Sequence, residues 1–171
     1  MVWCAPRSGP VRDQRLSELR YDDRFDPRTA SREEIELRAR KMRGRTLREL
    51  GVSVTAARER ASGDKGIVGI LVESYFGIRQ NSESAPDFTG AGVELKVVPL
   101  KPGSSRARSV RVKERTSVTM IDYATLVEER WANASVRKKL NAILFVYFVH
   151  EKLLTPETAL DCRISDVVHG H

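Results

Sequence analysis

The stretch Pro86–Leu100, which reads PDFTGAGVELKVVPL, decides the fold. Its second half alternates as a β-strand, and three apolar residues share one face of that strand, namely Val93, Leu95 and Val97. Glu94 and Lys96 share the opposite face with Val98, because residues two apart in a strand project the same way. Pro99 predicts a strand end or a sheet edge. We therefore expect a strand that carries a carboxylate and an amine side by side.

Asp87 precedes this strand and is separated from it by a segment with two glycines, Gly90 and Gly92. Glycine permits a sharp reversal of the chain, which would bring Asp87 back to the strand near Glu94 and Lys96. Two carboxylates and a cation are what metal-dependent phosphodiester hydrolysis requires. The alternative interpretation is that Glu94 and Lys96 are the solvent face of an amphipathic strand, since the bare D…ExK pattern also occurs by chance.

Other segments predict helices and further strands. Ser31 and Glu34 have capping-box spacing and predict a helix that ends near Gly44, and Thr46 with Glu49 repeats the pattern. A third helix is expected in SGDKGIVGILVESYFGI, capped by Ser62 or Asp64 and ended by Gly77. The run ILFVYFV at 143–149 is apolar enough for a strand in the middle of a sheet. Residues 1–31 show no apolar period and predict a flexible or loosely packed N-terminal arm, followed by one domain at 32–171.

Two residues on or before the third helix extend the candidate site. Glu73 lies at i+4 from Gly69 and i+7 from Gly66, so a close approach of this glycine face to the strand would bring Glu73 to the site. Its alternative role is a structural carboxylate with a hydrogen-bond or ion-pair partner. Lys65 stands where a phosphate could meet free backbone N–H groups, although a solvated lysine is the more common situation.

Charge and composition narrow the class of protein. The chain of 171 residues has 30 Lys and Arg against 23 Asp and Glu, a net charge of +7, which favours a polyanionic partner such as nucleic acid. Six basic residues accompany one acid in the run 101–115, which predicts a phosphate-binding loop or hairpin made of Lys101, Arg106, Arg108, Arg111, Lys113 and Arg115. Cys4 and Cys162 form no CxxC pair, which argues against a zinc site or disulfide framework and favours the cytoplasm. The longest apolar run is too short to cross a membrane, so no membrane partner is expected.

Four blocks, in order and with similar spacing, resemble the MutH family of DNA endonucleases, which contains a mismatch-repair nickase and GATC-cutting type II restriction enzymes. The blocks are the G-x-T-L-x-E-L segment at 44–50, DKGIVGILVE, PDFTGAGVELKVVPL and WANASVRKKLNAILFVYF. The resemblance covers about Lys41 to Glu151. It implies an α/β fold of the restriction-endonuclease type, with a mixed central sheet flanked by helices.

The resemblance also implies roles for individual residues. Glu73, Asp87 and Glu94 match the acidic residues around Mg²⁺, and Lys96 matches the catalytic lysine. Lys139 matches a second lysine near the active site, with neighbouring Lys138 as the alternative match. Two further features match the family: Lys65 falls on the DNA-contacting lysine of the KGxxG segment, and ERTSVTMIDY is closer to the restriction-enzyme branch.

The function expected from this resemblance is Mg²⁺-dependent hydrolysis of double-stranded DNA by a type II restriction enzyme, with a GATC-like site left open. The alternatives are a mismatch-repair nicking endonuclease and a non-cleaving DNA-binding or regulatory module. Family members continue well past the position of His171, so we expect the chain to lack a C-terminal part. Besides double-stranded DNA, the expected partners are a second copy of the chain or that missing C-terminal domain.

Overall fold

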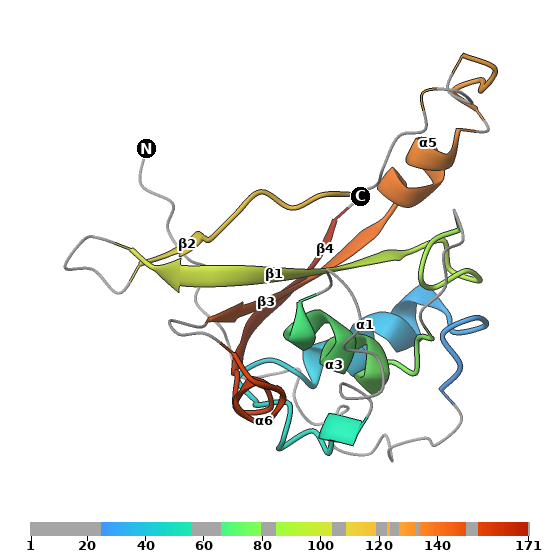
Figure 1. The fold of residues 1–171 in the computed structure, drawn as a ribbon. Helices are drawn as coiled ribbons and strands as arrows, with labels where there is room; N and C mark the ends of the chain where they lie inside the picture. The colour runs from blue at the N-terminus through green and yellow to red at the C-terminus, as the bar shows by residue number, and fades with distance from the viewer. Residues whose placement is uncertain are drawn as a thin grey trace, which may run out of the picture.

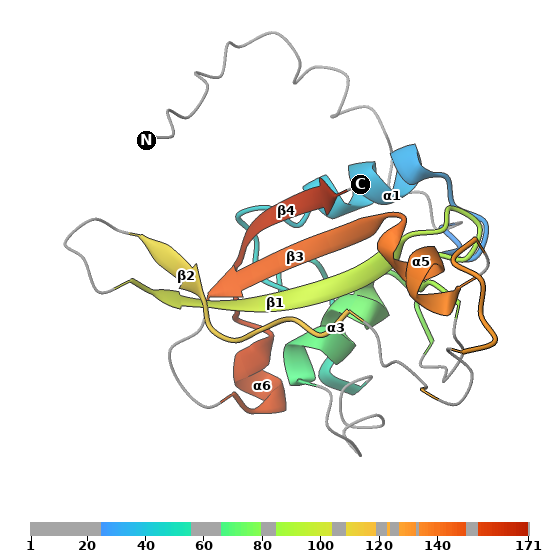
Figure 2. The same ribbon diagram turned by 90° about the horizontal axis from the view of Figure 1, so that it is seen from above.

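The computed structural model describes residues 25–55, 66–79, 85–103, 109–118, 123, 127–132, 134–149 and 154–170. Along the chain these residues form the following elements: α1 (Arg32–Arg40), α3 (Ile67–Tyr75), β1 (Glu94–Pro102), β2 (Val110–Val112), α5 (Ser135–Leu140), β3 (Ile143–Val149), α6 (Pro156–Ala159) and β4 (Ile164–Gly170). Figure 1 shows α1 and α3 on one side of the strands, and Figure 2 shows the strands side by side from above. The predicted α/β class is confirmed.

The strands form one mixed sheet in the order β2-β1-β3-β4. The two central strands β1 and β3 are parallel, in a register that pairs Glu94 with Ile143 and Leu100 with Val149. The outer strands β2 and β4 each run antiparallel to their neighbour. The run at 143–149 is therefore a central strand, as its apolar composition predicts.

The alternation along β1 and β3 separates an inner face of the sheet from an outer one. Leu95 on β1 and Leu144 and Val146 on β3 belong to the main hydrophobic core, together with buried residues of α1 and α3. Phe88 is fully buried against Phe76 at the end of α3, with ring centroids 5.3 Å apart and nearly perpendicular planes. Because side chains alternate, the same strands turn Glu94, Lys96 and their neighbours on β3 to the outer face.

Strand β1 continues through Pro99 to Pro102, beyond the end that the proline predicts. The amide of Lys113 donates to the carbonyl of Pro99 (2.9 Å), so this residue turns its backbone polar groups toward β2 and away from β3. Pairing of β1 with β2 begins only at Leu100. Pro99 thus accepts one hydrogen bond from the residue opposite it but has no N–H to return a second, so the β1–β2 ladder starts one residue later.

The helix signals had mixed outcomes. Ser31 and Glu34 form the predicted capping box, and α1 ends at Arg40, one turn before Gly44. Thr46 and Glu49 exchange the same two hydrogen bonds, but the segment is a hydrogen-bonded turn and the predicted second helix is wrong. The segment turns at Gly51, whose φ of 75° is incompatible with a right-handed helix.

Helix α3 ends as predicted and begins differently. Its N-cap is Gly66, so the prediction of a cap at Ser62 or Asp64 is wrong. Phe76 is the C-cap, and Gly77 follows it with a φ of 69°, which is the left-handed conformation that terminates many helices.

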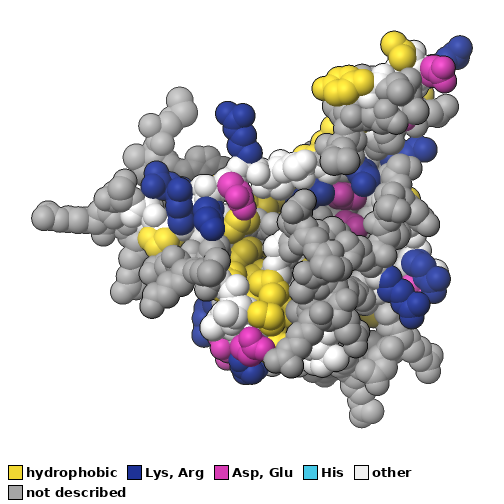
Figure 3. Space-filling model, viewed as in Figure 1, with side chains coloured by type: hydrophobic (Ala, Val, Ile, Leu, Met, Phe, Trp, Pro, Cys, Tyr) yellow, Lys and Arg dark blue, Asp and Glu magenta, His cyan; other side chains and the backbone are white. Residues whose placement is uncertain are grey.

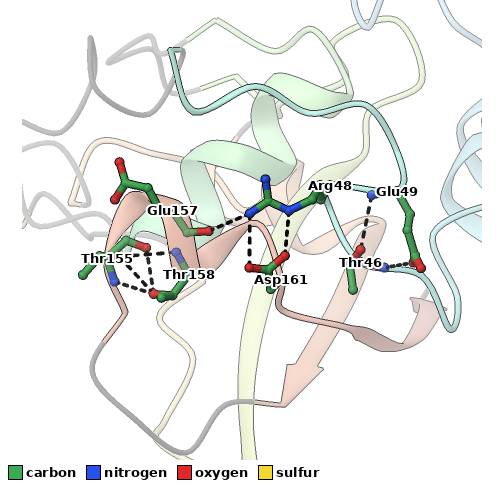
Figure 4. Close-up of polar contacts among 7 residues, drawn as sticks. All are labelled: Thr46, Arg48, Glu49, Thr155, Glu157, Thr158 and Asp161. Carbon is green, nitrogen blue, oxygen red and sulfur yellow. Dashed lines mark hydrogen bonds and ion pairs between the residues drawn. The ribbon is translucent and has the colours of Figure 1, made fainter.

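The C-terminal elements α6 and β4 were not predicted. Thr155 and Thr158 cap α6 reciprocally, with proline at its first position, and these contacts are drawn in Figure 4. Arg48 reaches across to this region, where its Nε lies 2.7 Å from Asp161 Oδ1 and its Nη2 donates to the Glu157 carbonyl at 3.3 Å. The 46–50 turn and α6 are thereby joined on the rim of the domain.

The segment predicted as an arm is only partly described. Residues 1–24, with Cys4, lie outside the described residues. Phe25 packs against Phe76 with ring centroids 6.2 Å apart, and Ala30 is in the hydrophobic core. Cys162 is a free, buried thiol whose pKa is raised by burial. The helices of the described ranges include none that is long and apolar enough to cross a membrane.

Candidate active site

The candidate site lies at the end of the sheet where the parallel strands β1 and β3 begin. The Glu94 amide donates to the Ala142 carbonyl (2.9 Å), which fixes the first residue of β1 beside the start of β3. Helix α5 immediately precedes β3, so this pairing also brings α5 to the start of β1, as Figure 1 shows. Residues far apart in sequence therefore meet at Glu94.

Glu94 is the only polar or charged residue that is buried among the described residues, at 4% exposure. Its Oε1 lies 2.8 Å from Lys96 Nζ and 3.9 Å from Lys139 Nζ. Within the described part of the chain, its Oε2 is buried and has no hydrogen-bond partner. A buried carboxylate is costly unless it is paired, and here two amines share one of its oxygens. The interpretation of Glu94 as part of a solvent face is therefore wrong.

Asp87 is brought back to the strand by a tight turn. Its Oδ2 accepts a hydrogen bond from the Leu95 amide (2.9 Å), next to Glu94 in the chain. The turn is closed by a bridge between Phe88 and Val93, whose backbone groups exchange hydrogen bonds of 2.9 and 3.2 Å. The predicted return of Asp87 to the start of β1 is observed.

Glu73 lies on α3, the helix that packs against β1, and its Oε2 is buried. The predicted close approach of the Gly66 and Gly69 face to the strand is not observed, however. A Cβ at Gly66 or Gly69 would meet no atom within 4 Å, so the glycine face of α3 makes no close approach to the described residues. The described residues also contain no group of three His, Cys, Asp or Glu side chains placed to hold a metal ion. Helix α3 thus packs against β1, but Glu73 forms no three-carboxylate cluster with Asp87 and Glu94 in the described structure.

Basic residues surround the other end of β1. Strand β2 turns back on β1 as a hairpin in which Lys101 stands directly opposite Arg111. Arg111, Lys113 and Arg115 are exposed, and Figure 3 shows Lys and Arg side chains gathered over β2. Like charges directly opposite one another weaken a hairpin, which is consistent with a surface that meets a polyanion. The other predicted DNA contacts, Lys65, Arg106 and Arg108, lie outside the described residues.

Two features of the site were not found from the sequence. The first is that Lys139 shares Glu94 with Lys96, a contact that depends on the parallel pairing of β1 and β3. The second is Arg32 at the start of α1, whose Nε donates to the carbonyl of Ala91 in the turn after Asp87 (3.1 Å). The only signal for Arg32 was a cation in the first turn of a helix, where an acidic residue is preferred.

The donor set suits a hard divalent cation. Asp87 has one carboxylate oxygen on the Leu95 amide and a second oxygen left for other contacts, and Glu94 Oε2 is a buried acceptor without a hydrogen bond in the described structure. Mg²⁺ in proteins is commonly held by one or two carboxylates, with water and substrate phosphate as the remaining ligands. Two carboxylates at the start of one strand, with lysines beside Glu94, can bind such an ion and stabilise charge on a phosphoryl group.

Comparison with known proteins gives the same family as the sequence motifs. Residues 76–167 match the family described as DNA mismatch repair enzyme MutH. The type II restriction enzyme Sau3AI of Staphylococcus aureus is 29% identical over 71% of this chain and 24% of its own length. The DNA mismatch repair protein MutH of Klebsiella pneumoniae is 32% identical over 68% of this chain and 48% of its own length, and that of Pasteurella multocida is 33% identical over 52% and 37%.

The chain thus spans between a quarter and a half of the length of these relatives. The family match includes Asp87, Glu94, Lys96 and Lys139, the residues that meet at or next to the start of β1. The match extends over more than half of the chain, and the mixed sheet carries these residues at one end. This chain belongs to the MutH family.

Proposed function

We propose that residues 32–171 are the catalytic domain of a cytoplasmic, Mg²⁺-dependent endonuclease that hydrolyses phosphodiester bonds in double-stranded DNA. The observation that carries the proposal is the meeting of Asp87, Glu94 and Lys96 at the start of β1 in a MutH-family chain. A buried carboxylate that is paired with two lysines adds nothing to hydrophobic packing. It is, however, well suited to a charged substrate and a cation.

In this proposal Asp87 and Glu94 hold Mg²⁺, and Glu73 completes the site directly or through water. When bound, the ion supplies Lewis-acid stabilisation of charge on a phosphoryl oxygen. Asp87 enters the site already oriented, because one of its oxygens accepts the Leu95 amide. Glu94 is oriented by the amines of Lys96 and Lys139 on Oε1, which leaves Oε2 as the oxygen that can ligate the metal ion.

Lys96 acts on the attacking water. Its amine is held on Glu94 at 2.8 Å and its side chain is 19% exposed, so Lys96 is fixed in place and still accessible to substrate. The water oxygen bonds to phosphorus in line with the departing O3′, and the P–O3′ bond breaks. The products are a 5′-phosphate and a 3′-hydroxyl, and the proton lost by the water ends on the leaving oxygen or in solvent. Lys139 contributes a second positive charge beside the phosphate.

The DNA backbone is bound by the hairpin formed by β1 and β2. Lys101, Arg111, Lys113 and Arg115 carry the charge on its described part, with Lys65, Arg106 and Arg108 as further contacts. Each phosphate neutralised releases counterions, so the affinity should fall steeply with added salt. A second copy of the chain, or a further C-terminal domain, would complete the grip on the duplex.

Two kinds of cleavage are supported by different relatives. The similarity to the restriction enzyme Sau3AI favours cutting of both strands at a specific site, and this is the function that we propose. The similarity to proteins named DNA mismatch repair protein MutH favours nicking of one strand, which is the second candidate. A domain that binds DNA without cutting it is the third outcome of the same experiment.

The test is incubation of the purified protein with supercoiled plasmid, in Mg²⁺ and in EDTA, followed by end mapping of the products. Linear DNA with 5′-phosphates at a constant sequence supports the restriction reading, and open circles with one nick support the second candidate. Retarded DNA that stays supercoiled in Mg²⁺ would refute endonuclease activity for this chain. A variant with Arg111→Ala and Lys113→Ala, compared at two salt concentrations, tests whether the hairpin binds the backbone.

A further inference from the structure

We infer that Arg32 is a positioning residue for the divalent-cation site, acting through the turn that presents Asp87. This inference rests on the proposed function, because it assigns Arg32 a part in metal binding at Asp87 and Glu94. Arg32 is the first residue of α1, and its Nε donates to the backbone carbonyl of Ala91 at 3.1 Å in a partly buried contact. Ala91 belongs to the turn between Asp87 and β1.

The turn transmits position from Ala91 to Asp87 because it is short and closed. Phe88 and Val93 bridge its two sides, and the Gly92 amide donates to the Phe88 carbonyl at 2.9 Å. Phe88 itself is fully buried on Phe76. Asp87 is the residue just before this closed unit, and its carboxylate reaches the Leu95 amide just after it. A shift of the turn relative to β1 therefore moves the carboxylate of Asp87 relative to Glu94.

The helix gains little from a cation at this position. The N-terminus of a helix carries partial positive charge, and the other charged residues of the first turn, Glu33 and Glu34, are acidic as expected. An arginine there works against the helix dipole. Its partner is a backbone carbonyl on a segment far away in sequence, so its contact serves the turn more than α1.

A second contact shows that the turn is seated tightly on the segment before α1. A Cβ at Gly90 would lie 2.5 Å from the carbonyl oxygen of Arg28, so only glycine fits at this approach. The Thr89 hydroxyl also donates to that carbonyl at 3.4 Å. The turn is thus held by residues 28–32 in addition to its own bridge. These residues precede the family match at 76–167, so this support is not part of the matched region.

The experiment compares Arg32→Ala and Arg32→Lys with Arg40→Ala as the matched control. Arg40 lies on the same helix and pairs with Glu36 at 2.7 Å on the exposed face, so its removal perturbs α1 without touching the turn. Each protein is titrated with Mn²⁺ by calorimetry or electron paramagnetic resonance, without DNA. Amide hydrogen exchange at Leu95, the donor to Asp87, is measured in the metal-free proteins.

We expect Arg32→Ala to weaken Mn²⁺ binding about tenfold, as the loss of groups that orient metal ligands commonly does. Leu95 should exchange faster in the same variant, Arg32→Lys should recover part of both effects, and Arg40→Ala should match the parent. Gly90→Ala displaces the same turn and replaces Arg32→Ala if that variant does not fold.

Two results separate the inference from the proposed function. Equal Mn²⁺ affinity and equal Leu95 exchange in the parent and Arg32→Ala would overturn the inference while leaving the proposed function intact. A parent protein that binds no Mn²⁺ would overturn the metal site itself. Leu95 exchange would then still decide whether Arg32 positions Asp87, since faster exchange supports that role and unchanged exchange refutes it.

Discussion

Replacing Lys96 with methionine should destabilise the fold and at the same time improve binding of a divalent cation. Methionine fills similar space but leaves the Glu94 carboxylate, whose side chain is 5% exposed, without its nearest cation. Removing one partner of a buried ion pair typically costs about 3–5 kcal/mol. Lys96 is 19% exposed, and Lys139 remains 3.9 Å from the same oxygen, so the loss should be smaller. We expect Lys96→Met to lower the free energy of unfolding by about 2 kcal/mol at neutral pH.

The assay is urea unfolding followed by circular dichroism, with Glu94→Gln and the double variant Glu94→Gln/Lys96→Met beside the single variant. The double variant should regain most of the lost stability, because it removes the uncompensated charge. Mn²⁺ should bind Lys96→Met more tightly than the parent, since the amine nearest to Glu94 no longer competes with the metal ion, while cleavage is lost. This account of Glu94 would be refuted if Lys96→Met were as stable as the parent. It would also be refuted if the stability loss of the double variant equalled the sum of the losses of the two single variants.

Three further predictions concern the framework of the site. Phe88→Ala should lower the free energy of unfolding by about 3–5 kcal/mol in urea melts, because Phe88 is fully buried; a loss below about 1 kcal/mol would contradict its role under the turn. Gly69→Ala should increase the free energy of unfolding by about 0.5–1 kcal/mol and raise the melting temperature slightly, because a Cβ there meets no described atom. A lower melting temperature would show that the glycine face is occupied. Arg48→Ala should melt at a lower temperature than the parent at neutral pH and at the same temperature in acid. The hydrogen bond from Arg48 lowers the pKa of Asp161. The stabilisation is therefore present above the ordinary carboxyl pKa and is lost as the pH falls through the lowered pKa. A constant difference in melting temperature across that pH range would contradict the last prediction.

The local features of the site could be predicted from the sequence because they depend on short-range geometry. The alternation in GVELKVVPL places Glu94 and Lys96 on one face whatever the rest of the fold is. The glycines before it allow Asp87 to return, and Ser31 with Glu34 sets the start of α1. The resemblance to the MutH family added Lys139, which no spacing argument connects to Glu94.

The burial of Glu94 and the support from Arg32 could not be predicted, because both depend on contacts between distant segments. Glu94 is buried by the packing of α5 and β3 beside β1, whose parallel pairing the sequence does not specify. The capping pattern at Thr46 failed for a related reason. Its two hydrogen bonds form, but the chain turns at Gly51 and a bridge from Thr46 to Arg163 takes the segment to β4.

The elements at 156–170 also carry local sequence signals. Thr155 followed by proline and by Thr158 is an N-terminal helix signature, and Cys162 and Ile164 begin an alternating pattern of buried residues. A strand after this helix could therefore have been expected, whereas its antiparallel pairing with β3 is known from the structure.

The most direct test of the central claim is Mg²⁺-dependent cleavage of plasmid DNA by the parent, Lys96→Ala and Asp87→Ala, each with its melting temperature recorded. The account predicts that the parent cuts only with Mg²⁺ and that each folded variant cuts at least about a hundredfold more slowly, the usual scale for removing a preorganised catalytic group. Arg40→Ala, on the exposed face of α1, should cut at the parental rate. A folded Lys96→Ala or Asp87→Ala protein that cuts as fast as the parent would contradict the assignment of the active site.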